Sequence, residues 1–171
     1  MTTTTGNADI DYTCGTTKLR GHLARPAGGG AKRPGVVVVH EWWGVNDYVR
    51  GRARQLADLG YVALAADMYG EGRTADAPAE AAALMNAALA DPKALEARFE
   101  AAADLLRGQP DVDPHRIAAI GYCFGGAVCL HMARCGMTLA GVVSFHGALG
   151  SMHKPGKGGV KARVLVCHGA D

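Results

Sequence analysis

The sequence predicts an α/β fold, in which a mostly parallel central sheet carries helices on both faces. Residues 35–40 form a continuous valine-rich run, which is typical of a strand buried on both faces of a parallel sheet. After it, apolar runs of strand length alternate with segments of helical periodicity, and such alternation gives right-handed β-α-β units. With 171 residues, of which 49% are hydrophobic, the chain fits one domain, residues 1–171, able to bury a core.

The first elements are short strands around a hairpin. Residues 9–13 and 18–24 are extended candidates, and Gly15-Thr16-Thr17 between them predicts the turn. The segment 26–34 is rich in glycine and alanine and predicts a loop before the valine-rich strand at 35–40.

A helix is expected after the valine-rich strand. Val49, Ala53 and Leu56 have helical spacing and lie between the capping candidates Asn46 and Asp47 and a stop at Gly60. The arginines at 50, 52 and 54 should line the solvent side of this helix. Residues 61–68 are the next strand.

Two helical segments come next. Residues 76–90 are rich in alanine and have only a weak apolar stripe, whereas Asp91-Pro92 begins a clearer helix that ends at Gly108. The apolar face of the second helix consists of Leu95, Phe99, Ala102 and Leu106.

The last third alternates again. We expect strands at 116–121, 139–145 and 162–167, and a helix at 124–134 that ends before Gly136. The glycine- and lysine-rich segment 154–161 is a loop too short to link domains.

Composition excludes several classes of function. A formal net charge of +2, with basic residues scattered among acids, argues against a nucleic-acid partner. The threonine-rich start has no apolar core of a signal peptide, and no stretch approaches the roughly 18 apolar residues of a membrane span. Five cysteines without C-x-x-C spacing predict neither a disulfide framework nor a metal site, so we expect a cytoplasmic protein.

One segment has the pattern of a nucleophile. Gly121-Tyr122-Cys123-Phe124-Gly125 has the form G-x-nucleophile-x-G of a strained turn that raises the attacking side chain above a sheet. The helix N-terminus favours the thiolate form of a cysteine. The alternative is a buried structural cysteine in a glycine-rich turn. Because the motif requires a strand before and a helix after, and both are predicted, we favour Cys123 as a nucleophile.

A second unusual segment, His40-Glu41-Trp42-Trp43-Gly44, directly follows the valine-rich strand, at the sheet edge where open α/β sheets place their sites. With a nucleophile at Cys123, the backbone N–H groups of Trp42 and Phe124 are the expected oxyanion hole. Glu41 is either a partner of the Cys123 thiol or a carboxylate in a surface turn or salt bridge.

The chain resembles the dienelactone hydrolase family of α/β hydrolases. The residues that carry the resemblance are the 36–44 segment, Gly60-Tyr61 leading to Asp67-Met68-Tyr69, the run Gly121–Gly126 and the terminal Gly169-Ala170-Asp171. The resemblance implies an α/β-hydrolase fold and hydrolysis of a cyclic enol ester by a cysteine, aspartate and histidine triad, without cofactor.

By position, the resemblance assigns Cys123 as the nucleophile, Glu41 as the glutamate that interacts with the thiol, and Asp171 as the triad acid. The family's substrate carboxylate is held by arginines, and Arg73 is the candidate near the expected face, although a solvated loop arginine is the alternative.

The chain departs from the family at its end. The family's triad histidine follows the acid by several dozen residues, and no residue of this sequence follows Asp171. We therefore expect a domain that lacks its final strand and helix, and we predict that these 171 residues alone turn over little substrate. His146, at a predicted strand end, is the histidine most worth testing in the site, with a pocket-lining or structural role as the favoured interpretation.

The leading hypothesis is a hydrolase that cleaves an ester or lactone through a thioester on Cys123. Two alternatives remain. The first is a non-catalytic protein whose exposed sheet edge pairs with a partner, and the second is another glutamate-assisted thiol enzyme. The hydrolase would act on a small molecule, without membrane or nucleic acid, as a monomer or weak homo-oligomer.

Overall fold

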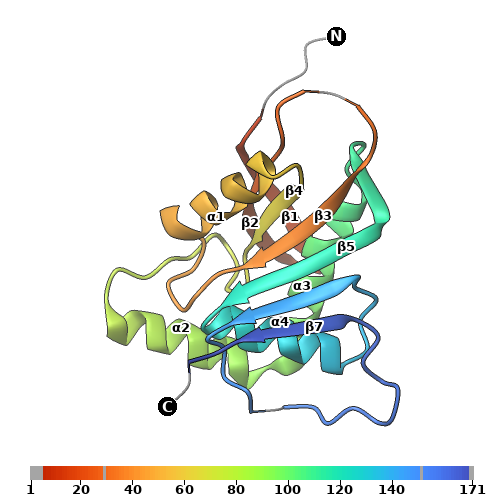
Figure 1. Cartoon of the computed structure of the whole chain (residues 1–171). Coiled ribbons are helices and arrows are strands. Elements are labelled where there is room, and N and C mark those ends of the chain that lie inside the picture. Colours follow the sequence, from red (N-terminus) through yellow and green to blue (C-terminus); the bar gives the residue numbers. More distant parts are fainter. Residues whose placement is uncertain (1–5, 29, 151, 170–171) are drawn as a thin grey trace.

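The computed structural model describes residues 6–28, 30–150 and 152–169. Within them, strands and helices alternate after an initial hairpin (Figure 1). In chain order the elements are β1 (Ala8–Cys14), β2 (Thr17–Ala24), β3 (Arg33–Val39), α1 (Asp47–Asp58), β4 (Val62–Ala66), α2 (Pro78–Ala90), α3 (Pro92–Arg107), β5 (Val112–Tyr122), α4 (Phe124–Arg134), β6 (Gly141–Phe145) and β7 (Arg163–Cys167).

All described strands belong to one sheet of order β1-β2-β4-β3-β5-β6-β7. The strands from β4 to β7 in this order are parallel to one another, and only β1 and β2 are antiparallel to their neighbours. The predicted mostly parallel α/β sheet is therefore confirmed. Because the parallel strands point the same way, the loops after β3, β4, β5 and β6 share one edge of the sheet (Figure 1).

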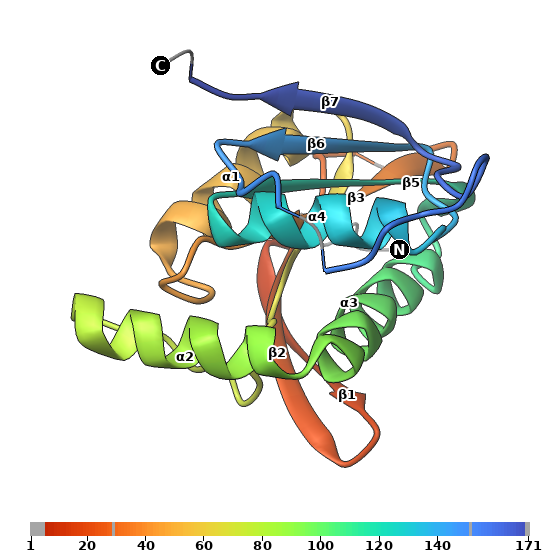
Figure 2. The same ribbon diagram turned by 90° about the horizontal axis from the view of Figure 1, so that it is seen from below.

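Helices cover both faces of the sheet, as predicted. Val36 and Val38 of β3 point toward α1 and pack with Val49 and Ala53, whereas Val37 and Val39 belong to the larger core under α3 and α4. Figure 2 shows α3 and α4 in a layer on one side of the sheet and α1 on the other. The continuous valine run thus reflects burial on both faces.

Helices α1 and α3 begin where the sequence signals predict, whereas α2 begins at Pro78 and not at residue 76. Asn46 caps α1 by accepting a hydrogen bond from the Val49 N–H at 3.2 Å, and Asp91 caps α3 through the Ala94 N–H at 3.0 Å. All four predicted core residues of α3 are buried. In α2, Ala77 provides no side-chain cap, and the two described core positions are alanines, which agrees with the weak apolar stripe.

In α1, Leu56 is partly buried and packs against the core with Val49 and Ala53, as expected, and Ala57 beside it is buried as well. The position of one arginine was predicted wrongly. Arg52 does not point into solvent, because its guanidinium lies 4.9 Å from the ring centre of Tyr48 and 5.4 Å from that of Tyr122. Tyr48 of α1 and Tyr122 at the end of β5 thus determine where this arginine lies.

The five cysteines are all unpaired in the described structure. None of the helices that the described ranges contain is both long enough and apolar enough to cross a membrane.

Candidate active site

Cys123 lies in the turn that joins β5 to α4. Its backbone has φ 53° and ψ −117°, a conformation that non-glycine residues rarely adopt. The Cys123 N–H donates a hydrogen bond to the carbonyl oxygen of Phe145 at 3.0 Å, which ties the turn to the end of β6. The turn therefore holds a half-buried thiol at the carboxyl edge of the sheet in a strained, fixed geometry.

The glycines around Cys123 allow this tight turn. A Cβ atom on Gly121 would lie 2.1 Å from the carbonyl oxygen of Gly125, and one on Gly125 would lie 2.3 Å from the carbonyl oxygen of Val39. Both distances are far shorter than real contacts, so any side chain here would force α4 away from the sheet. The motif's glycines are required because the strand, the turn and the helix touch through their backbones.

Two side chains, those of His40 and Tyr69, hold the backbone of the loop after β3 in place. The Nδ1 of His40 hydrogen-bonds to the carbonyl oxygen of Glu41, and the hydroxyl of Tyr69 donates to the carbonyl oxygen of Trp42 at 2.9 Å. Both carbonyls thus point toward the protein interior. These two contacts hold the peptide backbone of the loop at Glu41 and Trp42 in place.

His40 is neutral in the folded protein. Its Nε2 accepts a hydrogen bond from the Met68 N–H at 3.3 Å, so the ring proton is on Nδ1, where it can be donated to Glu41. Burial lowers the pKa of His40, against smaller opposing effects of the Glu41 carbonyl and the Asp67 carboxylate. His40 therefore positions the loop and does not serve as a base.

The rings of His40, Tyr69 and Phe124 form one packed group. Ring centres lie 4.7 Å apart for His40 and Tyr69, 5.8 Å for His40 and Phe124, and 5.7 Å for Tyr69 and Phe124. Phe124 is the first residue of α4, where a backbone N–H has no partner inside the helix. The group thus joins the two predicted oxyanion-hole segments, the 40–42 loop and the start of α4.

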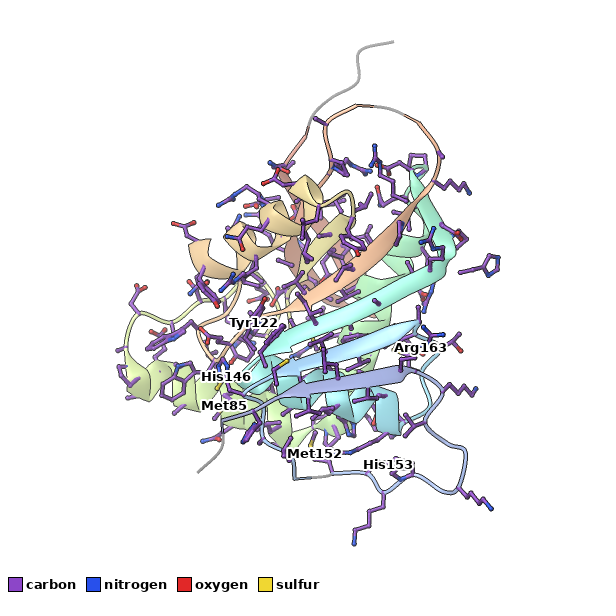
Figure 3. All side chains as sticks on the ribbon, viewed as in Figure 1. Met85, Tyr122, His146, Met152, His153 and Arg163 are labelled. Carbon is purple, nitrogen blue, oxygen red and sulfur yellow. The ribbon has the colours of Figure 1, made fainter. Side chains whose placement is uncertain are left out.

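Glu41 lies beside His146 in this site. The Glu41 Oε1 is 3.4 Å from the Nε2 of His146, which follows β6. His146 has φ 42°, and its N–H donates to the carbonyl oxygen of Cys167 at 2.8 Å, so the strand end fixes its backbone. Figure 3 shows His146 near Tyr122 at the carboxyl ends of β5 and β6. The two side chains can form an ion pair whenever His146 is protonated.

Aromatic residues form the wall next to this pair. Tyr122 and Phe145 stack with ring centres 4.9 Å apart, and Arg52 donates a hydrogen bond to the Tyr48 hydroxyl at 3.0 Å. Burial raises the pKa of Tyr122. The wall therefore places the Tyr122 phenol and the Arg52 guanidinium near Glu41.

Arg73 is occupied by the protein backbone. Its guanidinium donates to the carbonyl oxygens of Tyr69 and Gly70, the latter at 3.3 Å. The residues that follow run alongside the loop His40–Gly44, here called the tryptophan loop, since the Ala75 N–H donates to the carbonyl oxygen of Trp43 at 3.1 Å. Arg73 thus lies on the expected side of the sheet, but in this structure it holds a loop. Asp171, the predicted triad acid, lies outside the described residues.

Comparison with known proteins is decisive for the family. The sequence profile described as "Dienelactone hydrolase family" matches residues 19–171. The chain belongs to the dienelactone hydrolase family. A "Putative carboxymethylenebutenolidase" of Aquifex aeolicus is 32% identical over 120 residues, which are 68% of this chain and 50% of that protein. The chain spans about half the length of the curated relatives that it matches.

Solved structures of the dienelactone hydrolase type are also similar. The structure named "m3DLH" has 45% sequence identity and a TM-score of 0.89, and covers 96% of this chain and 69% of that one. A "Dienelactone Hydrolase-like Promiscuous" phosphotriesterase, P91, from metagenomic libraries has 43% identity and a TM-score of 0.88, with coverage of 97% and 69%. The fold is an α/β-hydrolase fold.

The stabilising roles of His40, Tyr69 and Asp67 in the site were not predicted from the sequence. His40 and Tyr69 hold the carbonyl groups of the tryptophan loop, and Asp67 accepts from the N–H groups of Tyr69, Gly70 and Gly72 at 2.8–2.9 Å. The available signal was a polar residue directly after each apolar strand, His40 after β3 and Asp67 after β4. That signal marks a sheet edge but does not reveal which groups the side chain will contact.

Proposed function

We propose that this chain carries the nucleophile and the oxyanion hole of an enzyme that hydrolyses a small ester or lactone. The observation that carries the proposal is the strained backbone of Cys123 at the turn between β5 and α4. Residues in such conformations cluster at active sites because the surrounding structure must maintain them. The family membership of the chain supports the same reaction class.

In the proposed reaction, the Cys123 sulfur attacks the carbonyl carbon of the substrate. The carbonyl oxygen becomes an oxyanion and accepts hydrogen bonds from the Phe124 and Trp42 N–H groups. The C–O bond then breaks, the leaving oxygen takes up the proton that the Cys123 thiol has lost, and the acyl group remains on Cys123 as a thioester. Water subsequently cleaves the thioester, which returns the thiol and releases the acid.

Deacylation requires a base that activates water. From the resemblance to the family we expect that base to be a histidine that follows the triad acid, and we propose Asp171 as this acid. Glu41 and His146 lie 3.4 Å apart in the site, and we propose that they adjust the charge near the thiol rather than replace that base. Acylation of these 171 residues should therefore be much faster than turnover.

Acylation and turnover can be separated with an activated ester such as p-nitrophenyl acetate. We expect a burst of about one p-nitrophenol per chain, followed by slow release, and an acyl group on Cys123 in the intact mass and peptide map. Cys123→Ala should abolish the burst. Rapid multiple turnover by these 171 residues, or a burst that survives in Cys123→Ala, would refute the mechanism.

Cys135→Ser is the matched control for the burst. Burial raises the pKa of the Cys129 thiol, and burial together with the Glu96 carboxylate raises that of Cys135, so neither should compete near neutral pH. The Cys135→Ser variant should keep the full burst amplitude. A burst reduced equally by both substitutions would indicate general thiol reactivity instead of a site.

A phosphotriester is a second candidate substrate class. It is favoured by 43% identity to P91, which is named a promiscuous phosphotriesterase. Paraoxon offers a direct test, because attack by Cys123 on phosphorus would release p-nitrophenol and leave a diethylphosphoryl group on the sulfur. Absence of this adduct, with acylation by the carboxylic ester intact, would restrict the site to carboxylic esters.

A further inference from the structure

Three metal-ligating side chains meet between α3 and α4, away from the candidate active site. They are Glu96 on α3, His131 in the last turn of α4 and Cys135 directly after α4. The Glu96 Oε1 is 3.0 Å from the His131 Nε2 and 3.7 Å from the Cys135 Sγ, and the same two atoms of His131 and Cys135 are 3.6 Å apart.

These distances match the edges of a zinc coordination polyhedron. Zinc binds imidazole nitrogen and carboxylate oxygen at about 2.0–2.1 Å and thiolate sulfur at about 2.3 Å, in tetrahedral geometry. Ligand atoms on such a tetrahedron are about 3.3–3.6 Å apart. The three measured separations of 3.0, 3.6 and 3.7 Å differ from this range by at most a few tenths of an ångström. An ion could therefore enter with little movement of the side chains.

The fold holds the three groups in place. His131 and Cys135 are four residues apart, so they lie on the same side of α4. The His131 side chain is only 4% exposed, and Glu96, at 22%, is fixed from the other side by Lys93, whose Nζ contacts its second oxygen, Oε2, at 2.7 Å. Cys135 is exposed, so an ion can reach the three side chains from solvent.

We propose that Glu96, His131 and Cys135 bind one Zn²⁺ ion, with water in the fourth position. Glu96 and Cys135 also line a surface hollow of about 670 Å³ together with Glu100, Arg107 and His115, which leaves room for that water. The ion would join α3 to α4. Zinc accepts this mixture of nitrogen, oxygen and sulfur ligands, whereas Mg²⁺ and Ca²⁺ require oxygen.

The proposed site is separate from the nucleophile. Cys123 precedes α4 and Cys135 follows it, so the eleven residues of α4 lie between them, and a step of twelve residues along a helix corresponds to about 18 Å. Zinc at this site should therefore leave the Cys123 thiol free. This distinguishes the proposal from zinc capture by the catalytic cysteine.

Zinc binding can be measured on chelator-treated protein, with ZnCl₂ titrated against a chromophoric chelator. We expect one ion per chain, and a melting temperature higher by roughly 5–10 °C when free zinc is about 100 times its Kd. Co²⁺ in place of zinc should give the visible bands of tetrahedral cobalt and a thiolate charge-transfer band. These readouts do not depend on enzyme activity.

Variants then locate the ion. Cys135→Ser should weaken zinc binding by more than about 100-fold, because loss of an outer-shell partner alone costs about 10- to 100-fold. Glu96→Gln provides a second test on another helix, and Cys167→Ser is the control, since Cys167 is also exposed.

The proposal is overturned if wild-type protein binds zinc no more tightly than Cys135→Ser. It is equally overturned if Cys123→Ser, and not Cys135→Ser, removes the tight site. A folded Glu96→Gln variant that binds zinc as the wild type does would remove the glutamate from the site and reject the three-ligand arrangement.

Discussion

Ser144 of β6 is a buried polar residue whose hydroxyl has no hydrogen-bond partner in the described structure. The oxygen lies where β6 approaches α4, and a Cβ atom on Gly126 or on Gly147 would be 2.6 Å from it. A buried hydroxyl without a partner loses its bonds to water on folding and gains none in return.

Ser144→Ala should therefore leave the free energy of unfolding unchanged or increase it by up to about 1 kcal/mol. Urea denaturation followed by circular dichroism measures the change. Ser144→Thr is the control, because its added methyl group must fit beside α4, and it should lower the free energy of unfolding by about 1–3 kcal/mol. A loss of more than 1 kcal/mol in Ser144→Ala would reveal a partner for the hydroxyl, such as a bound water.

His40 gives a pH dependence whose sign is determined by burial. Burial lowers the pKa of His40 in the folded protein, whereas in the unfolded chain it titrates near 6.5. Below that pH the unfolded chain binds a proton that the folded protein does not, so its stability decreases as the pH falls. Between pH 7.5 and 5.5 His40 should therefore contribute a loss of at most about 1.4 kcal/mol, which is the limit for an imidazole that takes up no proton in the folded protein.

The test combines unfolding and NMR. Urea denaturation at pH 7.5 and 5.5 measures the loss, and the imidazole signals of His40 should not titrate in the folded protein over this range. Titration of His40 near pH 6.5 in the folded state would contradict a buried, neutral role behind the tryptophan loop.

Among the contacts between elements, the contact between β5 and α4 leaves the least space for an added side chain. A Cβ atom on Gly121 would collide with the backbone of Gly125, which cannot move independently of the helix. The cost of overpacking is about 1–3 kcal/mol even where side chains can adjust. We expect Gly121→Ala to lower the free energy of unfolding by at least about 3 kcal/mol and to abolish acylation of Cys123.

Gly51 in α1 provides a matched control for this prediction. A Cβ atom there would meet only the Arg54 side chain, at 3.8 Å, and the residue lies inside a helix. Gly51→Ala should raise the free energy of unfolding by about 0.5–1 kcal/mol. If both variants were equally stable, the turn at Cys123 would have to be more adaptable than its contacts indicate.

At the scale of the whole molecule, β7 is an edge strand of the described sheet, at the opposite edge from β1. It pairs with β6 on one side only among the described strands, and Val164, Leu165 and Val166 are 45%, 56% and 41% exposed. A groove of about 450 Å³ next to it is lined by apolar residues of β3, β5, β6 and β7, including Val36, Ile120 and Val143. Unpaired apolar strands promote association between chains.

We therefore expect these 171 residues to self-associate with increasing concentration, as light scattering or sedimentation would detect. Val164→Lys combined with Val166→Lys should reduce association, because charged residues protect edge strands. If the wild-type protein stayed monomeric over the whole concentration range, β7 would not mediate association between chains. These changes lie outside the 40–42 loop and the turn at Cys123, so acylation should persist.

Much of the fold could be predicted from local pattern. The valine run, the capped helix with its buried Phe99 and Leu106, and the helix that begins at Phe124 all appear within a few residues of their expected positions. The ends of the strands were predicted less accurately. For example, β5 begins at Val112, whereas the sequence pattern predicts residue 116. Its early part pairs irregularly with β3, which no periodicity could indicate.

The sequence by itself determined the fold class, the family resemblance and the prediction of Cys123 as nucleophile, because these depend on periodicity and on a short motif of neighbouring residues. Tertiary structure alone decided which distant groups meet. It placed Glu41 beside His146, directed Arg73 to backbone carbonyls, put His40 and Tyr69 behind the tryptophan loop, and joined Glu96 to α4. Such contacts depend on strand order and helix packing, which no local pattern of residues specifies.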